Sequence, residues 1–277
     1  MQAEKEFAVT NEVSGAAAVE SRRNRYARRA VRAMWAINLA SLAGVCLWAY
    51  LDSRFGATAY FLKADVAWMF GYGDMSTARS EPLLWRLLLL LAILIAALIS
   101  GLVIFAALFA GPHQHRRLRS WFWLTAFAAA WLAVAVNWQE FTWLGQQRRV
   151  RSALGSFQLL AETLRRDWPR VDGELPVLGP FMAYPIGKPS MLMLLTLPEI
   201  SQSEIAIAAV ERSPDGGLSF QLTRDETGAW LEWHPAGKTP ADFVGGVMTE
   251  YRVERYVAIA PEWFLVRYQE PSVKAAN

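Results

Sequence analysis

Residues 87–111 read LLLLLAILIAALISGLVIFAALFAG, a run of 25 residues without a charged side chain. An α-helix rises about 1.5 Å per residue, so roughly 20 apolar residues cross a hydrocarbon layer about 30 Å thick. Residues 33–51 and 120–139 form two further stretches of this kind, and residues 140–277 contain none. The sequence therefore predicts an α-helical membrane protein with three transmembrane helices, the second of them tilted because it exceeds the bilayer thickness.

The composition of the chain changes near residue 140. Charged residues make up 19% of the whole sequence, below the roughly 25% of soluble domains, and the deficit lies before this point. The remainder has the mixed composition of a soluble fold and is long enough to bury a core of its own. We therefore predict a basic N-terminal segment at 1–32, a membrane domain at 33–139 and a folded domain at 140–277.

Two arginine clusters predict how the chain is threaded. Arginine-rich flanks resist translocation, and the segment 52–82 between the clusters is much poorer in basic residues. The clusters occupy 1–32 and the loop 112–119, and their members are Arg22, Arg23, Arg25, Arg28, Arg29, Arg32, Arg116, Arg117 and Arg119. This pattern favours a cytoplasmic N-terminus and an extracytoplasmic domain at 140–277.

A third group of arginines indicates the opposite orientation. Arg148, Arg149 and Arg151 lie close enough to the end of the third stretch to count in the charge rule and favour a cytoplasmic C-terminal domain. We prefer the first orientation because two clusters beside short loops outweigh one cluster ahead of a long domain, which can translocate regardless of charge.

Cysteine and histidine usage predicts neither a metal nor another cofactor. Cys46 is the only cysteine, so the chain can form neither an intrachain disulfide nor a cysteine-based zinc site. His113 and His115 lie in the basic loop, where neighbouring arginines repel a cation and further ligands are lacking. The domain after residue 140 also lacks a glycosylation sequon. These features agree with a bacterial plasma (inner) membrane.

The three stretches contain no acidic or basic side chain deep within them, which disfavours an ion-coupled pump. Ala40 with Gly44 and Ala97 with Gly101 are pairs of small residues that allow helices to approach closely. We expect them to pack the three helices of one chain, with homo-oligomerisation or a protein partner as the alternative. The lipid bilayer is the predicted partner, and the net charge of +3 gives no indication of nucleic-acid binding.

The segment 52–82 is unusually apolar for a loop, with aromatic residues at Tyr60, Phe61 and Trp68. It predicts an interfacial helix on the outer leaflet that ends near Gly71. Such a helix would cover the membrane helices as a lid or present a docking surface.

The domain at 140–277 is predicted as α+β with an antiparallel sheet. Apolar residues recur at helical spacing from Val150 to Trp168, Pro169 ends that helix, and Gly145 is a candidate joint with the third span. A region rich in turn formers follows at 173–189. Strand patterns occupy 191–197, 204–212, 218–223, 229–233, 252–259 and 263–269, whereas 242–248 is ambiguous. One long helix on five or six strands results.

No recognised catalytic motif occurs in the chain. If the domain were an enzyme, His234, Glu232 and Asp225 would be the candidate catalytic residues. A general base needs a positioned nucleophile, and paired carboxylates need a separation of roughly 5–10 Å, neither of which a sequence displays. The hypothesis is therefore a non-catalytic interaction, sensing or assembly domain, and the alternative is a membrane-anchored extracytoplasmic hydrolase or transferase.

Overall fold

The computed structural model describes residues 2–69, 81–110, 118–200, 205–223, 228–245 and 250–269. The chain forms two compact units. One consists of Met1–Leu47 and Arg79–Asn137, and the other of Trp48–Ala78 and Trp138–Asn277. The basic loop 112–119 and its histidines fall largely outside the described residues, as does Asp225.

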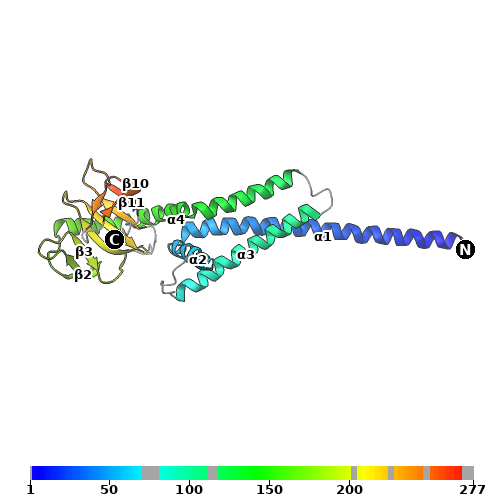
Figure 1. Ribbon diagram of the computed structural model, residues 1–277, viewed down its shortest axis with the longest axis horizontal. Coiled ribbons are helices and arrows are strands. Elements are labelled where there is room, and N and C mark those ends of the chain that lie inside the picture. The colour runs from blue at the N-terminus through cyan, green and yellow to red at the C-terminus, as the bar shows by residue number, and fades with distance from the viewer. Residues whose placement is uncertain are drawn as a thin grey trace. The chain divides into compact units, whose positions relative to one another are not determined.

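Four helices are present in the described residues: α1 (Gln2–Leu51), α2 (Phe55–Met69), α3 (Glu81–Ala110) and α4 (Leu118–Arg166) (Figure 1). Three of them, α1, α3 and α4, are long and apolar enough to cross a membrane. This confirms the three predicted long apolar helices. In α1 the apolar part extends from Arg29 to Leu51, and in α3 from Leu84 to Phe109.

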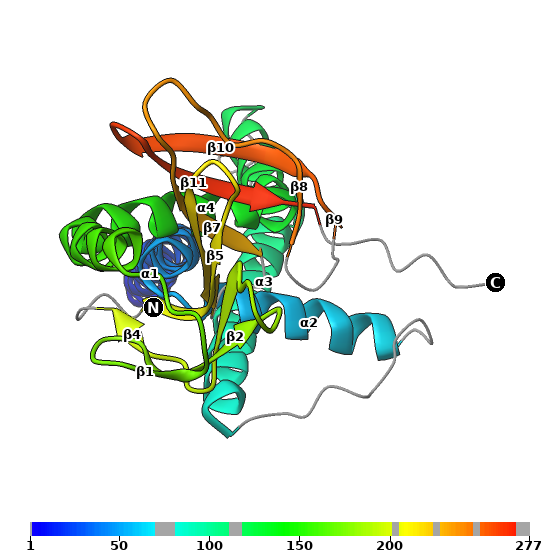
Figure 2. The ribbon, with the colours of Figure 1, turned by 90° about the vertical axis from the view of Figure 1, so that its left-hand side faces the viewer.

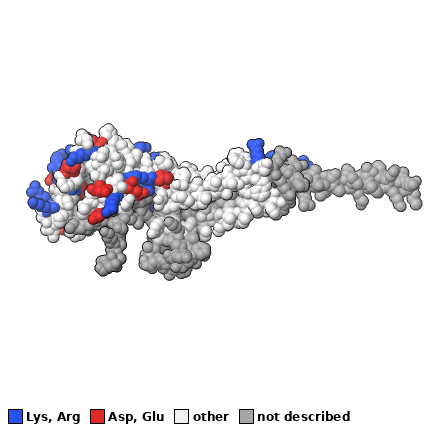
Figure 3. All heavy atoms as spheres, turned by 45° about the horizontal axis from the view of Figure 1, so that its top comes forward, with Lys and Arg blue, Asp and Glu red and all other residues white. Residues whose placement is uncertain are grey.

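The surface of these helices is apolar. Leu98 and Leu102 on α3, and Leu132 and Val136 on α4, are exposed although each carries a large aliphatic side chain. In Figure 3, lysine, arginine, aspartate and glutamate gather over the sheet domain, while the surface of the helices shows few of them. Exposed apolar area of this extent is typical of a surface that contacts a membrane or another protein. We therefore treat α1, α3 and the first part of α4 as membrane helices.

Asn38 joins the three membrane helices. Its Nδ2 donates hydrogen bonds to the carbonyl of Ala97 at 2.9 Å and to Oγ of Ser100 at 3.0 Å, both on α3. The indole Nε1 of Trp131 on α4 donates to Oδ1 of Asn38 at 2.9 Å. A buried amide in lipid costs free energy unless it is paired, and here both ends of the amide are paired.

The two pairs of small residues have different surroundings. Ala97 is buried and Gly101 faces the Asn38 amide, so this pair lets α1 approach α3 as predicted. Ala40 and Gly44 lie instead on an exposed face of α1. Ala97 and Gly101 therefore serve helix packing within one chain. A contact of Ala40 and Gly44 with a second protein stays a prediction.

α4 continues from the first unit into the second, and its bend lies at Asn137. The backbone there departs from helical values, with φ of −111° and ψ of 21°. The predicted joint at Gly145 is wrong because Gly145 is helical and buried against the end of α1. A Cβ at this position would overlap the backbone carbonyl of Tyr50. The glycine is thus needed for a close helix contact rather than for flexibility.

Gly145→Ala should therefore destabilise the second unit even though alanine is the better helix former. Overpacking of a tight contact costs typically about 1–3 kcal/mol, which exceeds the gain of about 1 kcal/mol from helix propensity. Gly155→Ala on the same helix is the matched control, because a Cβ there meets no atom within 4 Å. Urea titrations of the full chain in detergent, read by pulse proteolysis, should show a loss for the first variant and a gain for the second. An increase in the free energy of unfolding for both variants would contradict the close contact at Gly145.

α2 begins directly after α1 and is fixed at its start. Phe55 is buried, and its ring lies 5.5 Å from that of Trp48 and 6.5 Å from that of Trp138. Asp52 accepts hydrogen bonds from the Trp48 indole at 2.7 Å and from the Arg54 amide at 2.9 Å. The structure thus has a helix in the predicted segment, whereas its position on the outer leaflet stays a prediction.

The sheet domain contains more strands than the five or six predicted. The main sheet has nine strands in the order β1-β2-β3-β5-β6-β7-β11-β10, with β4 also paired to β5, and every pairing is antiparallel. A second ladder joins β8 to β9. The strands are β1 (Gly173–Leu175), β2 (Gly179–Tyr184), β3 (Met191–Leu194), β4 (Glu199–Ile200), β5 (Ile205–Arg212), β6 (Leu218–Thr223), β7 (Ala229–Trp233), β8 (Phe243–Val244), β9 (Glu250–Tyr251), β10 (Val253–Ala260) and β11 (Trp263–Tyr268).

β1 and β2 lie in the region that the sequence assigns to turns. Pro180 stands near the start of β2, where a proline is tolerated because few ladder hydrogen bonds precede it. Phe181 and Ala183 of β2 alternate into the core, which is the strand signal that the surrounding glycines and prolines hide.

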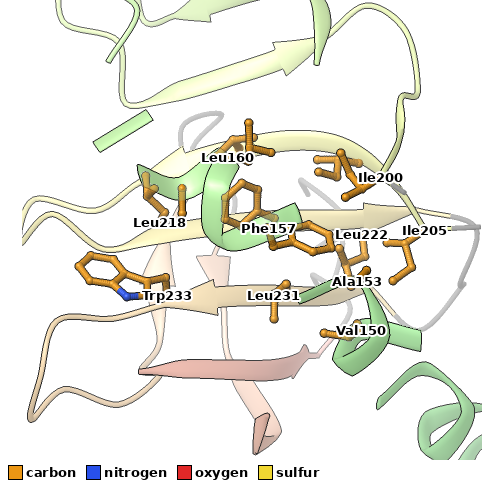
Figure 4. Close-up of a cluster of buried hydrophobic side chains, with 14 of the residues drawn as sticks. Val150, Ala153, Phe157, Leu160, Ile200, Ile205, Leu218, Leu222, Leu231 and Trp233 are labelled. Atoms are coloured by element: carbon orange, nitrogen blue, oxygen red, sulfur yellow. The ribbon is translucent and has the colours of Figure 1, made fainter. Parts of the chain in front are cut away.

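The core lies between α4 and one face of the sheet (Figure 4). Val150, Phe157, Ala161 and Leu164 repeat at helical spacing and are buried, which confirms the predicted apolar face of this helix. From the sheet, β5, β6 and β7 contribute side chains in alternation. The buried cluster includes Ala153, Leu160, Ile200, Ile205, Leu218, Leu222, Leu231 and Trp233.

Candidate functional site

The face of the sheet opposite α4 carries an aromatic cluster. On β7, Leu231 and Trp233 belong to the core against α4, so Trp230 and Glu232, which alternate with them, point to the other face. The β8–β9 ladder lies beside the start of β10 and the end of β11 (Figure 2) and covers this face. Rings of Phe243, Tyr251 and Tyr268 surround that of Trp230 at 5.2–6.1 Å.

The side chain of Glu232 is a buried carboxylate that accepts hydrogen bonds from three groups, and the residue is 1% exposed. The Tyr268 hydroxyl donates to its Oε1 at 2.6 Å, and Oγ of Ser219 donates to the same oxygen at 3.3 Å. Nε2 of His234 donates to Oε2 at 2.7 Å. A buried charge is tolerated when it is paired in this way, so the cluster satisfies the carboxylate.

Two of the three candidate catalytic residues, His234 and Glu232, are therefore in contact, and Asp225 lies outside the described residues. Ser219 and Tyr268 also belong to this group, and neither is a candidate from the sequence alone. Ser219 is the cross-strand partner of Glu232 on β6, and Tyr268 ends β11. Only the register of the strands brings these residues together, and no local motif signals it.

The arrangement does not match a nucleophilic relay. In such a relay histidine lies between the hydroxyl and the acid, whereas here Glu232 contacts both Ser219 and His234. Among the described residues, no group of three or more histidine, cysteine, aspartate or glutamate side chains could hold a metal ion. We therefore interpret the cluster as a hydrogen-bonded polar network that fixes the register of β6, β7 and β11.

Burial raises the pKa of the Tyr268 phenol well above its ordinary value, and the charge of Glu232 and its hydrogen bond raise the pKa further. The folded domain consequently keeps this proton at a pH where the unfolded chain loses it. Stability from this group is fully present below about pH 10, the unfolded pKa of tyrosine, and is lost as the pH rises above it.

We therefore expect the free energy of unfolding of the sheet domain to fall by up to about 1.4 kcal/mol per pH unit above pH 10 from Tyr268 alone. Urea titrations of the full chain in detergent at several pH values above and below this point measure the slope. Tyr268→Phe removes the ionising group and should give a shallower dependence. Equal slopes for the two proteins would show that the phenol ionises alike in both states.

Arginine–tryptophan contacts hold the edge of the sheet to α4. The guanidinium carbons of Arg255 on β10 and Arg267 on β11 lie 4.6 Å and 4.8 Å from the ring centre of Trp143. Nη1 of Arg255 also donates to both carboxylate oxygens of Glu140, at 2.8 Å and 2.7 Å. Cation–π contacts of partly desolvated arginines stabilise by about 1–2 kcal/mol each.

An apolar surface is exposed over β2 and β3. Met182 and Tyr184 point away from the core, and Met182 lies opposite Met193 in the ladder. Leu195 and Leu197, which follow β3, are 61% and 54% exposed. Contiguous exposed apolar side chains on a soluble domain are typical of contact sites, and methionine adapts its shape to varied partners.

No model of a known protein family matches the chain, and comparisons with curated proteins and with solved structures find no significant match.

Proposed function

We propose that the protein is a membrane-anchored, non-catalytic interaction domain that serves as a subunit of a larger envelope assembly. The observation that carries this proposal is the exposed apolar surface over β2 and β3, formed by Met182, Tyr184, Leu195 and Leu197. The network around Glu232 also supports the proposal, because both oxygens of the Glu232 carboxylate accept hydrogen bonds from side chains of the same domain.

We further propose that the N-terminus is cytoplasmic and the sheet domain extracytoplasmic, in a bacterial plasma membrane. The arginine clusters support this orientation. Arg148 stacks over the ring of Tyr50 at 5.8 Å, so at least one arginine of the opposing group has a structural use that is independent of topology. Reporter fusions after Gln269 test the orientation. Activity of a reporter that works only in the cytoplasm would contradict it.

Site-specific photocrosslinking tests the interaction surface. A photoreactive amino acid at Met182 should form a defined adduct in native membranes, whereas the same group at Leu159 should not. Leu159 is an exposed apolar residue on α4 and lies outside the β2–β3 surface, which makes it a matched control. The double substitution Leu195→Glu with Leu197→Glu should abolish the adduct because it places charge in the contact.

The proposal fails if neither position forms an adduct and the protein purified in mild detergent is a monodisperse monomer. It also fails if both positions form the same products, since the β2–β3 surface would then have no special role.

The alternative function is a membrane-anchored hydrolase or transferase, which the contact between His234 and Glu232 favours. A second buried carboxylate, that of Glu211 on β5, also supports this alternative. Glu211 and Glu232 both pair with Ser219, from the two strands that flank β6. Two strand spacings place the two glutamates about 10 Å apart. Hydrolytic activity of the purified protein that is lost in His234→Ala would support this alternative, and activity that survives would remove these residues from it.

A further inference from the structure

β10 is one of the two outer strands of the main sheet, and Figure 2 shows it at the margin of the domain. Within the described residues its ladder is with β11, on one side of the strand. Alternate residues of such an edge strand direct their N–H and C=O groups away from the sheet, where a further strand can pair with them. The residues of β10 that do so decide what this edge binds.

The hydrogen bonds of β11 identify these residues. The carbonyl of Glu262 accepts from the amide of His234, at the end of β7, at 2.9 Å. Because successive residues of a strand alternate, the even-numbered residues of β11 face β7 and the odd-numbered residues face β10. The odd-numbered Leu265 is the ladder partner of Val257, so the backbone groups of Val257 bond to β11.

Tyr256 and Ala258, on either side of Val257, therefore direct their backbone groups away from the sheet. The register with β11 is regular from Arg255 to Ala258, so the alternation holds throughout this segment. Both residues are exposed, and no hydrogen bond to their outward backbone groups occurs among the described residues. Each offers one donor and one acceptor, and the two residues lie about 6.8 Å apart along the strand.

Elsewhere, carboxylate side chains cap the sheet edges. At the start of β10, Oδ1 of Asp242 accepts from the amide of Val253 at 2.7 Å. At the opposite edge, Oδ1 of Asp172, next to β1, accepts from the amide of Ala183 on β2 at 2.8 Å. Each carboxylate occupies a donor that a partner strand would need. The middle of β10 has no such cap among the described residues.

The side chains beside the open segment are apolar on both faces of the sheet. Tyr256 is 48% exposed, and its ring meets that of Phe264 edge-on at 5.9 Å. Ala258 is a small exposed neighbour on the same face. On the other face Val257 packs at the margin of the core. An added strand would therefore bury cross-strand apolar pairs as well as form backbone hydrogen bonds.

We propose that β10 receives an extended segment of another protein, which pairs antiparallel with residues 255–258 and places apolar side chains beside Tyr256 and Val257. An extended peptide backbone repeats donors and acceptors at the spacing of Tyr256 and Ala258, which makes it the ligand that fits this edge. The register shifts at either end of the segment limit regular pairing to these residues.

This edge is a second contact site, separate from the β2–β3 surface near the other end of the sheet. It extends the interaction role proposed above. A second copy of the chain is the less suitable occupant. Two β10 strands would pair about a two-fold axis perpendicular to the sheet, and this rotation sets residues 138–166 of the two α4 helices antiparallel. Both helices continue from an apolar stretch at their N-terminal end.

Hydrogen exchange resolved to single amides tests the proposal. The full chain is compared in its native membranes and, after purification, in vesicles of phosphatidylcholine and phosphatidylglycerol. Lipid is present in both samples, whereas other proteins are present in the native membranes alone.

In the purified chain, the amides of Tyr256 and Ala258 should exchange at least about tenfold faster than that of Val257. In native membranes both should slow by about tenfold or more, because each gains a hydrogen bond. Equal rates in the two samples overturn the proposal. Slow exchange already in the purified chain overturns it as well, because the chain itself, a second copy or lipid would then cover the edge.

Proline variants show whether the protection comes from strand pairing. Ala258→Pro removes one outward donor, and proline is tolerated on an edge strand where the N–H faces away from the sheet. Tyr256 should then exchange in native membranes as fast as in the purified chain. Glu174→Pro is the matched control at the other edge and should leave Tyr256 protected. Glu174 faces outward because its partner Pro180 accepts from the amide of Leu195 on the inner side.

If Ala258→Pro does not fold, as judged by near-UV circular dichroism, Ala258→Lys takes its place, since an edge lysine disfavours strand addition. Protection of Tyr256 that persists in a folded variant overturns the proposal. Photocrosslinking from Met182 is measured in the same variants. An adduct at Met182 without protection of Tyr256 removes this second site and leaves the β2–β3 surface in place.

Discussion

Trp143→Ala should destabilise the sheet domain by about 3–5 kcal/mol, the cost of removing a large aromatic side chain from a packed core. Trp143 is buried, and its ring supports the guanidinium groups of Arg255 and Arg267. Without the indole these two cations, which are cross-strand partners, face each other across a cavity. Pulse proteolysis of the full chain in detergent, across a urea series, measures the loss.

Two further variants separate the causes of this effect. Trp143→Phe keeps an aromatic face for the arginines and should lose much less than the alanine variant. Leu159→Ala on the same helix removes an exposed side chain and should stay within about 0.5 kcal/mol of the parent protein. If Trp143→Ala behaves like Leu159→Ala, the sheet is not held to α4 through this residue.

Glu232→Ala should cost about 3–5 kcal/mol, because it leaves the partners of a buried carboxylate unpaired at about 1–3 kcal/mol each. These partners are the hydroxyls of Tyr268 and Ser219 and the imidazole of His234. The same urea series measures the change. Tyr268→Phe removes one donor and leaves the carboxylate with the other two, so it should cost only about 1–2 kcal/mol.

The double variant Glu232→Ala with Tyr268→Phe distinguishes a network from independent contacts. Once the carboxylate is gone, removing the Tyr268 hydroxyl relieves an unpaired group, so the two effects should not add. Additive losses would mean that Tyr268 and Glu232 stabilise the domain separately, contrary to the hydrogen bond between them.

The helices were largely predictable because their signal is local. A helix repeats its buried side every three or four residues, so the spacing of Val150, Phe157 and Leu164 identifies the core face of α4 without tertiary information. The strands from β5 to β7 and the hairpin of β10 with β11 follow from alternation in the same way. β1 and β2 were missed because glycine and proline dominate their segment and conceal the alternation of Phe181 and Ala183.

The polar networks were not predictable. Asn38 is conspicuous in the sequence as a polar residue in an apolar stretch, yet its partners Ala97 and Trp131 lie 59 and 93 positions away. Glu232 and His234 are neighbours on one strand and could be named together, but Tyr268 joins them from 36 positions away through the pairing of β11 with β7.

The sequence by itself determined that three apolar helices precede an α+β domain, because hydrophobic periodicity depends only on nearby residues and on the geometry of one element. The tertiary structure decided which polar groups meet, which apolar side chains of the sheet stay exposed and where α4 bends. These depend on strand register and helix contacts, in which a shift of one residue exchanges the two faces of a strand and replaces every partner.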